Sequence, residues 1–426
     1  MHEHPKLRPL EAFPVEVDGK QVICLRDPSG LSENVALVPR PVLHLVALLD
    51  GSRDLGELQA DYVRAGGELV SRDAIAGLLD QLDQANLLDS ERFRAHRDRV
   101  AAEFAAGPTR PAAHAGLSYP AEPETLRTFL DGFFDAGGTG EEAAPARPAP
   151  ARATAGRRPR QRRPQPVCAV VAPHIDFARG GRIYGLAYRP LLDEPPPDLY
   201  VVLGTDHNGD GTRYSLTRKS FDTPLGPVVT DGDAVEAVVR RAGPTLLRGE
   251  LNHRREHSIE FQAVALRYLA DRRGGGPPPA ILPILCGSFH ELVEHGADPA
   301  ADACIADLCG AVAEAVAGRR VVWIAAADLA HVGPHFGDPR PLGPRDLREL
   351  AEHDATLLAA VTAGDAAAFY RLLREEGDRR RVCGLPAIYT MLRLCGRARG
   401  EVRGYDQCPA DGGSRVSVAA VVLRPR

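Results

Sequence analysis

Short, nearly continuous apolar runs are the feature that most constrains this chain. Four of them, rich in Val, Ile and Leu and separated by helix-like segments, occupy residues 167–172, 199–204, 280–286 and 321–327. Such runs are typical of strands buried on both faces of an α/β sheet. A last strand is expected at 415–423, and long helices are predicted at 256–271, 300–317, 344–360 and 385–395. The sequence therefore predicts an α/β fold class for this part of the chain.

The N-terminal part has a different pattern. A hairpin-like stretch at 13–27 precedes residues 36–89, which predict a small helical unit. Its first helix ends at Gly51, and its third begins at Ser71, a residue suited to capping a helix. The apolar face of that third helix is formed by four leucines: Leu78, Leu79, Leu82 and Leu87. We expect one module at 1–100 and the α/β domain at 109–426.

The N-terminal module resembles a winged-helix or PqqD-like domain, through the segments LLDGSRDLGEL and LLDQLDQANLL. Such a module serves either DNA binding or peptide and protein recognition. DNA binding needs a basic recognition helix. Residues 71–90 instead carry a single base, Arg72, beside four acidic residues: Asp73, Asp80, Asp83 and Asp89. The acidic helix disfavours nucleic acid as a partner and favours a structural or partner-docking role.

Composition places further bounds. Residues 139–166 are rich in Pro, Ala and Arg and predict a disordered insertion within the larger domain.

The chain has no apolar run near the roughly 20 residues that span a bilayer and begins without a signal peptide, so we expect a cytoplasmic protein. The eight cysteines form no CxxC pair and are expected to be free thiols, one of them a ligand at most.

Histidine follows three of the apolar runs. His174 comes just after the first run, His207 after the second and His331 after the fourth. Acidic or amide side chains accompany them in the same segments: Asp176, Asp206, Asn208 and Asp328. Reactive groups gather beyond the carboxyl ends of strands in α/β sheets, so these side chains predict one shared site.

A fourth segment, EHSIEFQ at 256–262, adds His257 and Glu260, which share one face of a predicted helix. Glu256 equally fits a helix N-terminus, where acidic residues are favoured. Neutral imidazoles and carboxylates suit iron, copper, zinc or manganese. The pattern therefore predicts a metal site, with the remaining histidines and acids orienting ligands or moving protons.

Six segments in order resemble the Memo family: APHIDFARGGRIYG, LGTDHNGDG with the later TPLG turn, EHSIEFQ, ILPILCGSF, AADLAHVGPHFGD and VCGLPAIYTML. The match covers about residues 109–426. It implies a fold like the class III extradiol dioxygenases, with a mixed sheet flanked by helices. It also implies a metal site of two histidines and one cysteine, which by position are His174, His207 and Cys383.

The same resemblance assigns His257, Asp328 and His331 to acid–base or orienting roles in one pocket. A thiolate ligand favours iron or copper, with zinc as the alternative. Several positions depart from the family pattern, and none of them removes a proposed ligand: Asp206 replaces a serine, Thr205 a proline, Ala326 and Ala327 two serines, and Asp176 and Phe177 a Gly and a Tyr.

Two functions follow from this resemblance. One is a metal-dependent redox enzyme, of oxygenase type, that works with a radical SAM enzyme and an AMMECR-like partner, as the label AmmeMemoRadiSam system protein B of bacterial relatives implies. The other is a non-catalytic adaptor whose cleft binds a metal or a peptide. The N-terminal module suits either function as a docking site for a peptide or for the partner enzyme.

Overall fold

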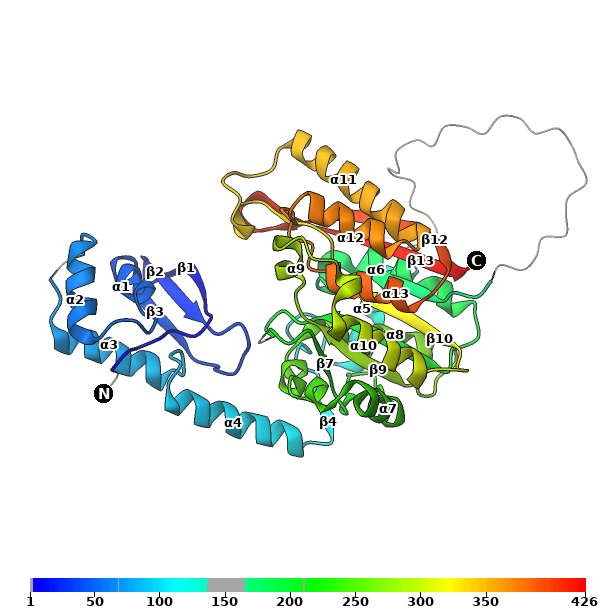
Figure 1. The fold of residues 1–426 in the computed structure, drawn as a ribbon, viewed down its shortest axis with the longest axis horizontal. Coiled ribbons are helices and arrows are strands. Elements are labelled where there is room, and N and C mark those ends of the chain that lie inside the picture. The colour runs from blue at the N-terminus through cyan, green and yellow to red at the C-terminus, as the bar shows by residue number, and fades with distance from the viewer. Residues whose placement is uncertain (1–2, 68, 136–164, 210) are drawn as a thin grey trace, which may run out of the picture. The chain divides into compact units, whose positions relative to one another are not determined.

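The computed structural model describes residues 3–67, 69–135, 165–209 and 211–426. The chain divides into two compact units, Met1–Pro108 and Thr109–Arg426, each with its own hydrophobic core (Figure 1). Most of the predicted disordered insertion, residues 139–164, lies outside the described residues. Within the described ranges, no helix combines the length and the apolar character needed to cross a bilayer.

The N-terminal unit combines a three-stranded antiparallel sheet with helices. The predicted hairpin forms as β1 (Glu11–Val17) and β2 (Lys20–Arg26), and β3 (Val35–Pro39) pairs with β2. The helices that follow are α1 (Leu43–Ala47), α2 (Leu55–Arg64), α3 (Arg72–Gln84) and α4 (Glu91–Ala106). Ser71 caps α3 as predicted, through its hydroxyl and the amide of Ala74.

The helix predicted from residue 36 is wrong over its first residues. Residues 35–39 are a strand because Val38 pairs with Ile23 of β2 and is buried in the core of this unit. The pairing partner lies 15 residues earlier, so the helical spacing of the local sequence did not reveal it. The resemblance to a winged-helix or PqqD-like domain stays a prediction.

The larger unit is built on a mixed sheet with the strand order β11-β13-β5-β10-β6-β9-β7, and β12 pairs with β13. Its four parallel strands form where the apolar runs predicted them: β5 (Ala169–Ala172), β6 (Leu199–Thr205), β9 (Ile281–Cys286) and β10 (Val321–Ala326). The remaining strands run antiparallel to their neighbours: β7 (Tyr214–Leu216), β11 (His331–Val332), β12 (Ala398–Ala410) and β13 (Ser414–Pro425).

Helices cover both faces of this sheet (Figure 1). One face packs on α5 (Pro123–Phe134), α6 (Phe177–Leu192) and α8 (His257–Arg272). The other packs on α7 (Gly232–Ala242), α10 (Ala303–Ala315), α11 (Pro344–Ala363), α12 (Ala366–Glu375) and α13 (Leu385–Leu394). Alternate residues of a strand serve the two cores: Val170 and Val171 of β5 lie on opposite faces. The predicted fold class, a mixed α/β sheet flanked by helices, is confirmed.

Candidate metal centre

The strands bring the predicted site residues to one edge of the sheet. β5 ends two residues before His174, β6 ends two residues before His207, and β10 ends two residues before Asp328. Because these strands are parallel, their carboxyl ends meet at the same edge. The helix α8 begins at His257 and adds a fourth side chain from its N-terminus.

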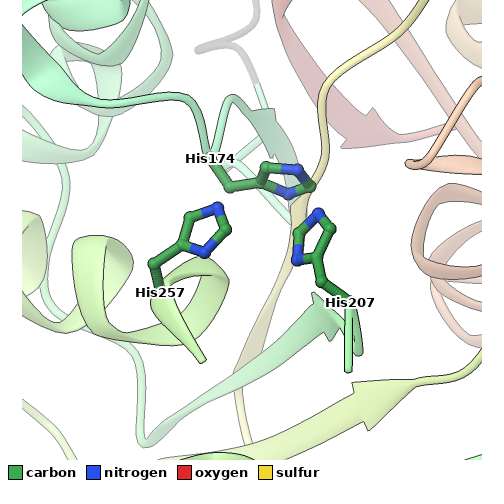
Figure 2. A group of neighbouring side chains, drawn as sticks. All are labelled: His174, His207 and His257. Atoms are coloured by element: carbon green, nitrogen blue, oxygen red, sulfur yellow. The ribbon is translucent and has the colours of Figure 1, made fainter. Parts of the chain in front are cut away.

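Three imidazoles converge at this edge. His174, His207 and His257 each present one ring nitrogen, and these nitrogens lie within 4.8 Å of one another (Figure 2). The ring centroid of His207 lies 4.9 Å from that of His174 and 4.7 Å from that of His257. Figure 2 shows the three rings approaching from separate chain segments. Such a cluster supplies the donor atoms that iron, copper or zinc prefers.

Glu256 orients two of these rings. Its buried carboxylate lies 3.0 Å from Nδ1 of His207 and 3.3 Å from Nδ1 of His257. It also accepts a hydrogen bond from the backbone amide of Ser258 at the start of α8. Burial alone would raise the pKa of Glu256, but the two histidines hold it well below its ordinary value. With Nδ1 committed to an ionised carboxylate, each ring leaves Nε2 available for a ligand bond.

His174 is oriented by the backbone instead. Its Nδ1 lies 2.9 Å from the carbonyl oxygen of Ala326, the last residue of β10. The backbone amides of His174 and Ile175 both donate to Oδ1 of Asp328. Asp328 therefore fixes the loop that carries His174, while its Oδ2 lies 3.7 Å from Nε2 of the same imidazole.

Cys383 reaches the same centre from the loop before α13. Its Sγ lies 3.2 Å from Nε2 of His174, and its side chain also interacts with His207. Burial would raise the pKa of this thiol, but His174, His331 and the hydrogen bonds to His174 and His207 lower it to about 5. The structure thus brings together the three predicted ligands, and it places His257 at the same point.

His331 lies farther out, on the short strand β11. Its Nδ1 is 3.2 Å from the carbonyl oxygens of Leu329 and Arg381, and its ring packs edge-on against Phe336. The rings of His331 and His335 both contact Phe336, from different directions. His331 therefore lines the cavity beside the centre and is not one of the clustered imidazoles.

A cavity of about 790 Å³ opens over these groups. Three imidazoles of the centre, Asp328 and His331 line it, together with side chains that the sequence interpretation left out: His114, Ser118, Arg179, His335 and Phe336. A volume of this size accommodates a small organic molecule. Its polar wall is dominated by histidine and carboxylate side chains, which are the commonest acid–base groups of enzyme sites.

Glu260 does not point toward the centre, although it lies on the same turn of α8 as His257. Its fully buried carboxylate forms an ion pair with Arg110. It also accepts hydrogen bonds from the hydroxyl of Tyr119 and from the backbone amides of Ala113 and His114. These bonds hold residues 110–119 against α8. They place the ring of His114 with its centroid 5.8 Å from that of His257.

The departures from the family pattern have local structural roles. The carboxylate of Asp206 accepts a hydrogen bond from the side-chain amide of Asn252 at 2.8 Å. Asp176 caps α6 through the amide of Arg179, and Phe177 is buried in the core. Ala326 and Ala327 are fully buried. None of these replacements falls on a proposed ligand.

Fold and site together define an α/β protein with a cluster of three histidines, arranged so that it could hold a metal ion, at the carboxyl edge of a mixed sheet. The family profile described as Memo-like protein matches residues 110–422. The chain belongs to the Memo family.

Relatives from bacteria and archaea share this similarity. A MEMO1 family protein of Aquifex aeolicus is 28% identical over 98% of this chain and 99% of its own length. The MEMO1 family protein TTHA0924 of Thermus thermophilus is 27% identical over 83% of this chain and 93% of its own. The MEMO1 family protein TK1477 of Thermococcus kodakarensis is 27% identical over 68% of this chain and 90% of its own.

Proposed function

We propose that this chain is a metal-dependent redox enzyme of oxygenase type, with the ion held by His174, His207 and Cys383. The observation that carries the proposal is the meeting of these groups: Sγ of Cys383 lies 3.2 Å from Nε2 of His174, inside a cluster of imidazole nitrogens. The donor set fits iron or copper, with zinc as the alternative. A bound iron or copper ion would supply one-electron redox chemistry and coordination positions for a small ligand.

The chain's own residues have distinct roles in this proposal. Glu256 and the carbonyl of Ala326 orient the imidazoles of His207 and His174 through Nδ1, which would leave Nε2 of each ring to hold the ion. His257 is neutral because burial lowers its pKa well below the ordinary value, which leaves the lone pair of its Nε2 able to accept a hydrogen bond from a bound molecule. Asp328 and His331 stand at the cavity wall as further acid–base groups.

The test is metal analysis of protein purified without oxygen, comparing wild type with Cys383→Ser and His257→Asn. Cobalt substitution adds a spectroscopic readout, because a thiolate ligand gives Co²⁺ an intense near-ultraviolet charge-transfer band. We expect Cys383→Ser to lose this band and His257→Asn to keep it. Wild-type protein that binds neither iron, copper nor cobalt would contradict the proposal.

A second candidate function is a non-catalytic adaptor that uses the same cleft for a metal or a peptide. The observation that favours it lies in the N-terminal unit, where the edge strand β3 exposes Val35 and Leu37. An adaptor would keep its partner affinity after metal removal, whereas an enzyme would lose turnover in His174→Ala and His207→Ala. For either function we propose the partners that the family resemblance suggests, a radical SAM enzyme and an AMMECR-like protein, testable by co-purification with and without residues 1–100.

A further inference from the structure

A second, smaller cavity reaches the metal centre from the side of the sulfur. It has a volume of about 310 Å³ and is lined by Cys383, His207 and residues that follow β6, β9 and the 378–383 loop. Cys383 does not line the larger cavity, where the imidazoles are exposed. Of the described residues, His207 alone lines both cavities.

Cys383 is therefore accessible from a cavity that is separate from the larger one. Cys383 is half-buried, and its carbonyl accepts the hydroxyl of Thr205 at the end of β6, which fixes the loop beside the strand. Its Sγ lies 3.2 Å from Nε2 of His174, and Cys383 also lines the small cavity. A molecule in this cavity would contact Cys383 while the larger cavity stays free for another molecule.

The small cavity is lined by apolar side chains and by charged side chains that already have partners. Its apolar groups are Cys286, Phe289, Val382, Leu385 and Pro386. Its charged side chains have partners elsewhere. Asp206 accepts from Asn252, and Asp378 accepts from the amide of Val382. Arg381 pairs with Asp338, and His290 pairs with Glu294.

This wall disfavours an anion. An anion entering here would lose its hydration without gaining a free cationic partner, since Arg381 and His290 are already paired, and burial of an unpaired charge is costly. An anion would in addition face the carboxylates of Asp206 and Asp378. The volume stands at the lower end of the range for small-molecule sites, about 300–1,000 Å³.

We propose that the small cavity is a second ligand site, which admits a small molecule without negative charge to the Cys383 side of the centre independently of the larger cavity. This inference rests on the proposed function in taking Cys383 as part of the metal centre. The two cavities would let two molecules approach the centre at the same time.

The experiment measures alkylation of Cys383 in the metal-free, full-length protein by iodoacetamide, resolved by peptide mass spectrometry. Ser288→Trp and His290→Trp narrow the exposed rim of the small cavity, and Asp411→Trp narrows the exposed rim of the larger one. Cys304, an exposed thiol that lines neither cavity, is the internal reference.

We expect Ser288→Trp and His290→Trp each to slow alkylation of Cys383 about tenfold relative to Cys304. Asp411→Trp should change the rate of Cys383 alkylation less than about twofold. Iodoacetate, the anionic analogue, should react with Cys383 more slowly than iodoacetamide after the same normalisation. Slowing by Asp411→Trp alone, slowing by none of the variants, or a preference for iodoacetate would overturn the proposal. Because the protein carries no metal in this assay, failure here is separate from failure of the metal analysis.

Discussion

The carboxylate of Glu256 lies 3.0 Å from Nδ1 of His207 and so fixes which nitrogen of that ring faces the centre. The same carboxylate reaches Nδ1 of His257 at 3.3 Å. One side chain at a helix N-terminus thereby orients two imidazoles that come from different chain segments. Groups of this kind control metal affinity through the ligands that they hold.

We expect Glu256→Gln to weaken metal binding about 10- to 100-fold, because the amide cannot accept from both imidazoles as an ionised carboxylate does. Competition with a chelator of known affinity measures the effect. Glu122→Gln is the matched control, since Glu122 also caps a helix through its carboxylate but touches no histidine. Equal metal affinity in the two variants would show that Glu256 is merely a helix cap.

The buried pair of Arg110 and Glu260 supports a prediction on stability. Both side chains are fully buried, and Arg110→Ala leaves the carboxylate of Glu260 without its counter-charge. We expect a loss of about 3–5 kcal/mol in the free energy of unfolding. The single tryptophan, Trp323 of β10, reports unfolding of this unit by fluorescence in a denaturant titration.

The control for that measurement is Arg345→Ala, which removes one partner of an exposed pair with Glu349 on α11. Exposed pairs of this kind contribute little, so we expect no measurable change in the free energy of unfolding. A loss at Arg110 no larger than the loss at Arg345 would mean that residues 110–119 are not held by the buried pair.

The sequence predicted the parallel strands because their burial on both faces produces uninterrupted apolar runs. It missed β12 (Ala398–Ala410), whose side chains are mostly exposed or half-buried and whose strand character comes from pairing with β13. The same reason explains β3, which depends on β2. Local pattern therefore identified buried elements and missed those that are defined by a partner strand.

The residues of the candidate site divide in the same way, into those that the local sequence reveals and those that depend on distant parts of the chain. His174, His207 and Asp328 were predicted because their positions just past the strands are visible in the sequence, whereas Cys383 was named through the family resemblance alone. Glu256 was interpreted as an acidic helix start, which it is, but its contact with His207 spans 49 residues. His114 carried no local signal, since its place depends on the buried Glu260.

Gly384 gives a prediction that links packing to the centre. A Cβ at this position would lie 2.4 Å from the carbonyl oxygen of Asp328 and 2.6 Å from Cβ of Ala327, so Gly384→Ala forces the adjacent Cys383 away from the strand. We expect a destabilisation of about 1–3 kcal/mol and loss of the cobalt charge-transfer band. Gly310→Ala on α10, where a Cβ meets open space, should instead stabilise the protein by about 0.4–1 kcal/mol.

His253 gives a prediction on pH. Its Nε2 lies 3.0 Å from the carbonyl oxygen of Ser215, and its buried Nδ1 has no hydrogen-bond partner among the described residues. Burial lowers the pKa of His253 from 6.5 to about 4, with Arg110 adding to this effect and Glu256 opposing it. The imidazole is therefore neutral in the folded protein.

Because the folded pKa of His253 lies below the unfolded one, the unfolded chain takes up a proton first as the pH falls below 6.5. The contribution of His253 to stability is present above pH 6.5 and is lost as the pH falls toward 4. Between pH 7 and pH 5 we expect wild type to lose about 2 kcal/mol more than His253→Gln, in which this position does not titrate. Fluorescence-detected unfolding of both proteins at the two pH values measures the difference, and parallel losses would show that His253 is protonated in the folded state.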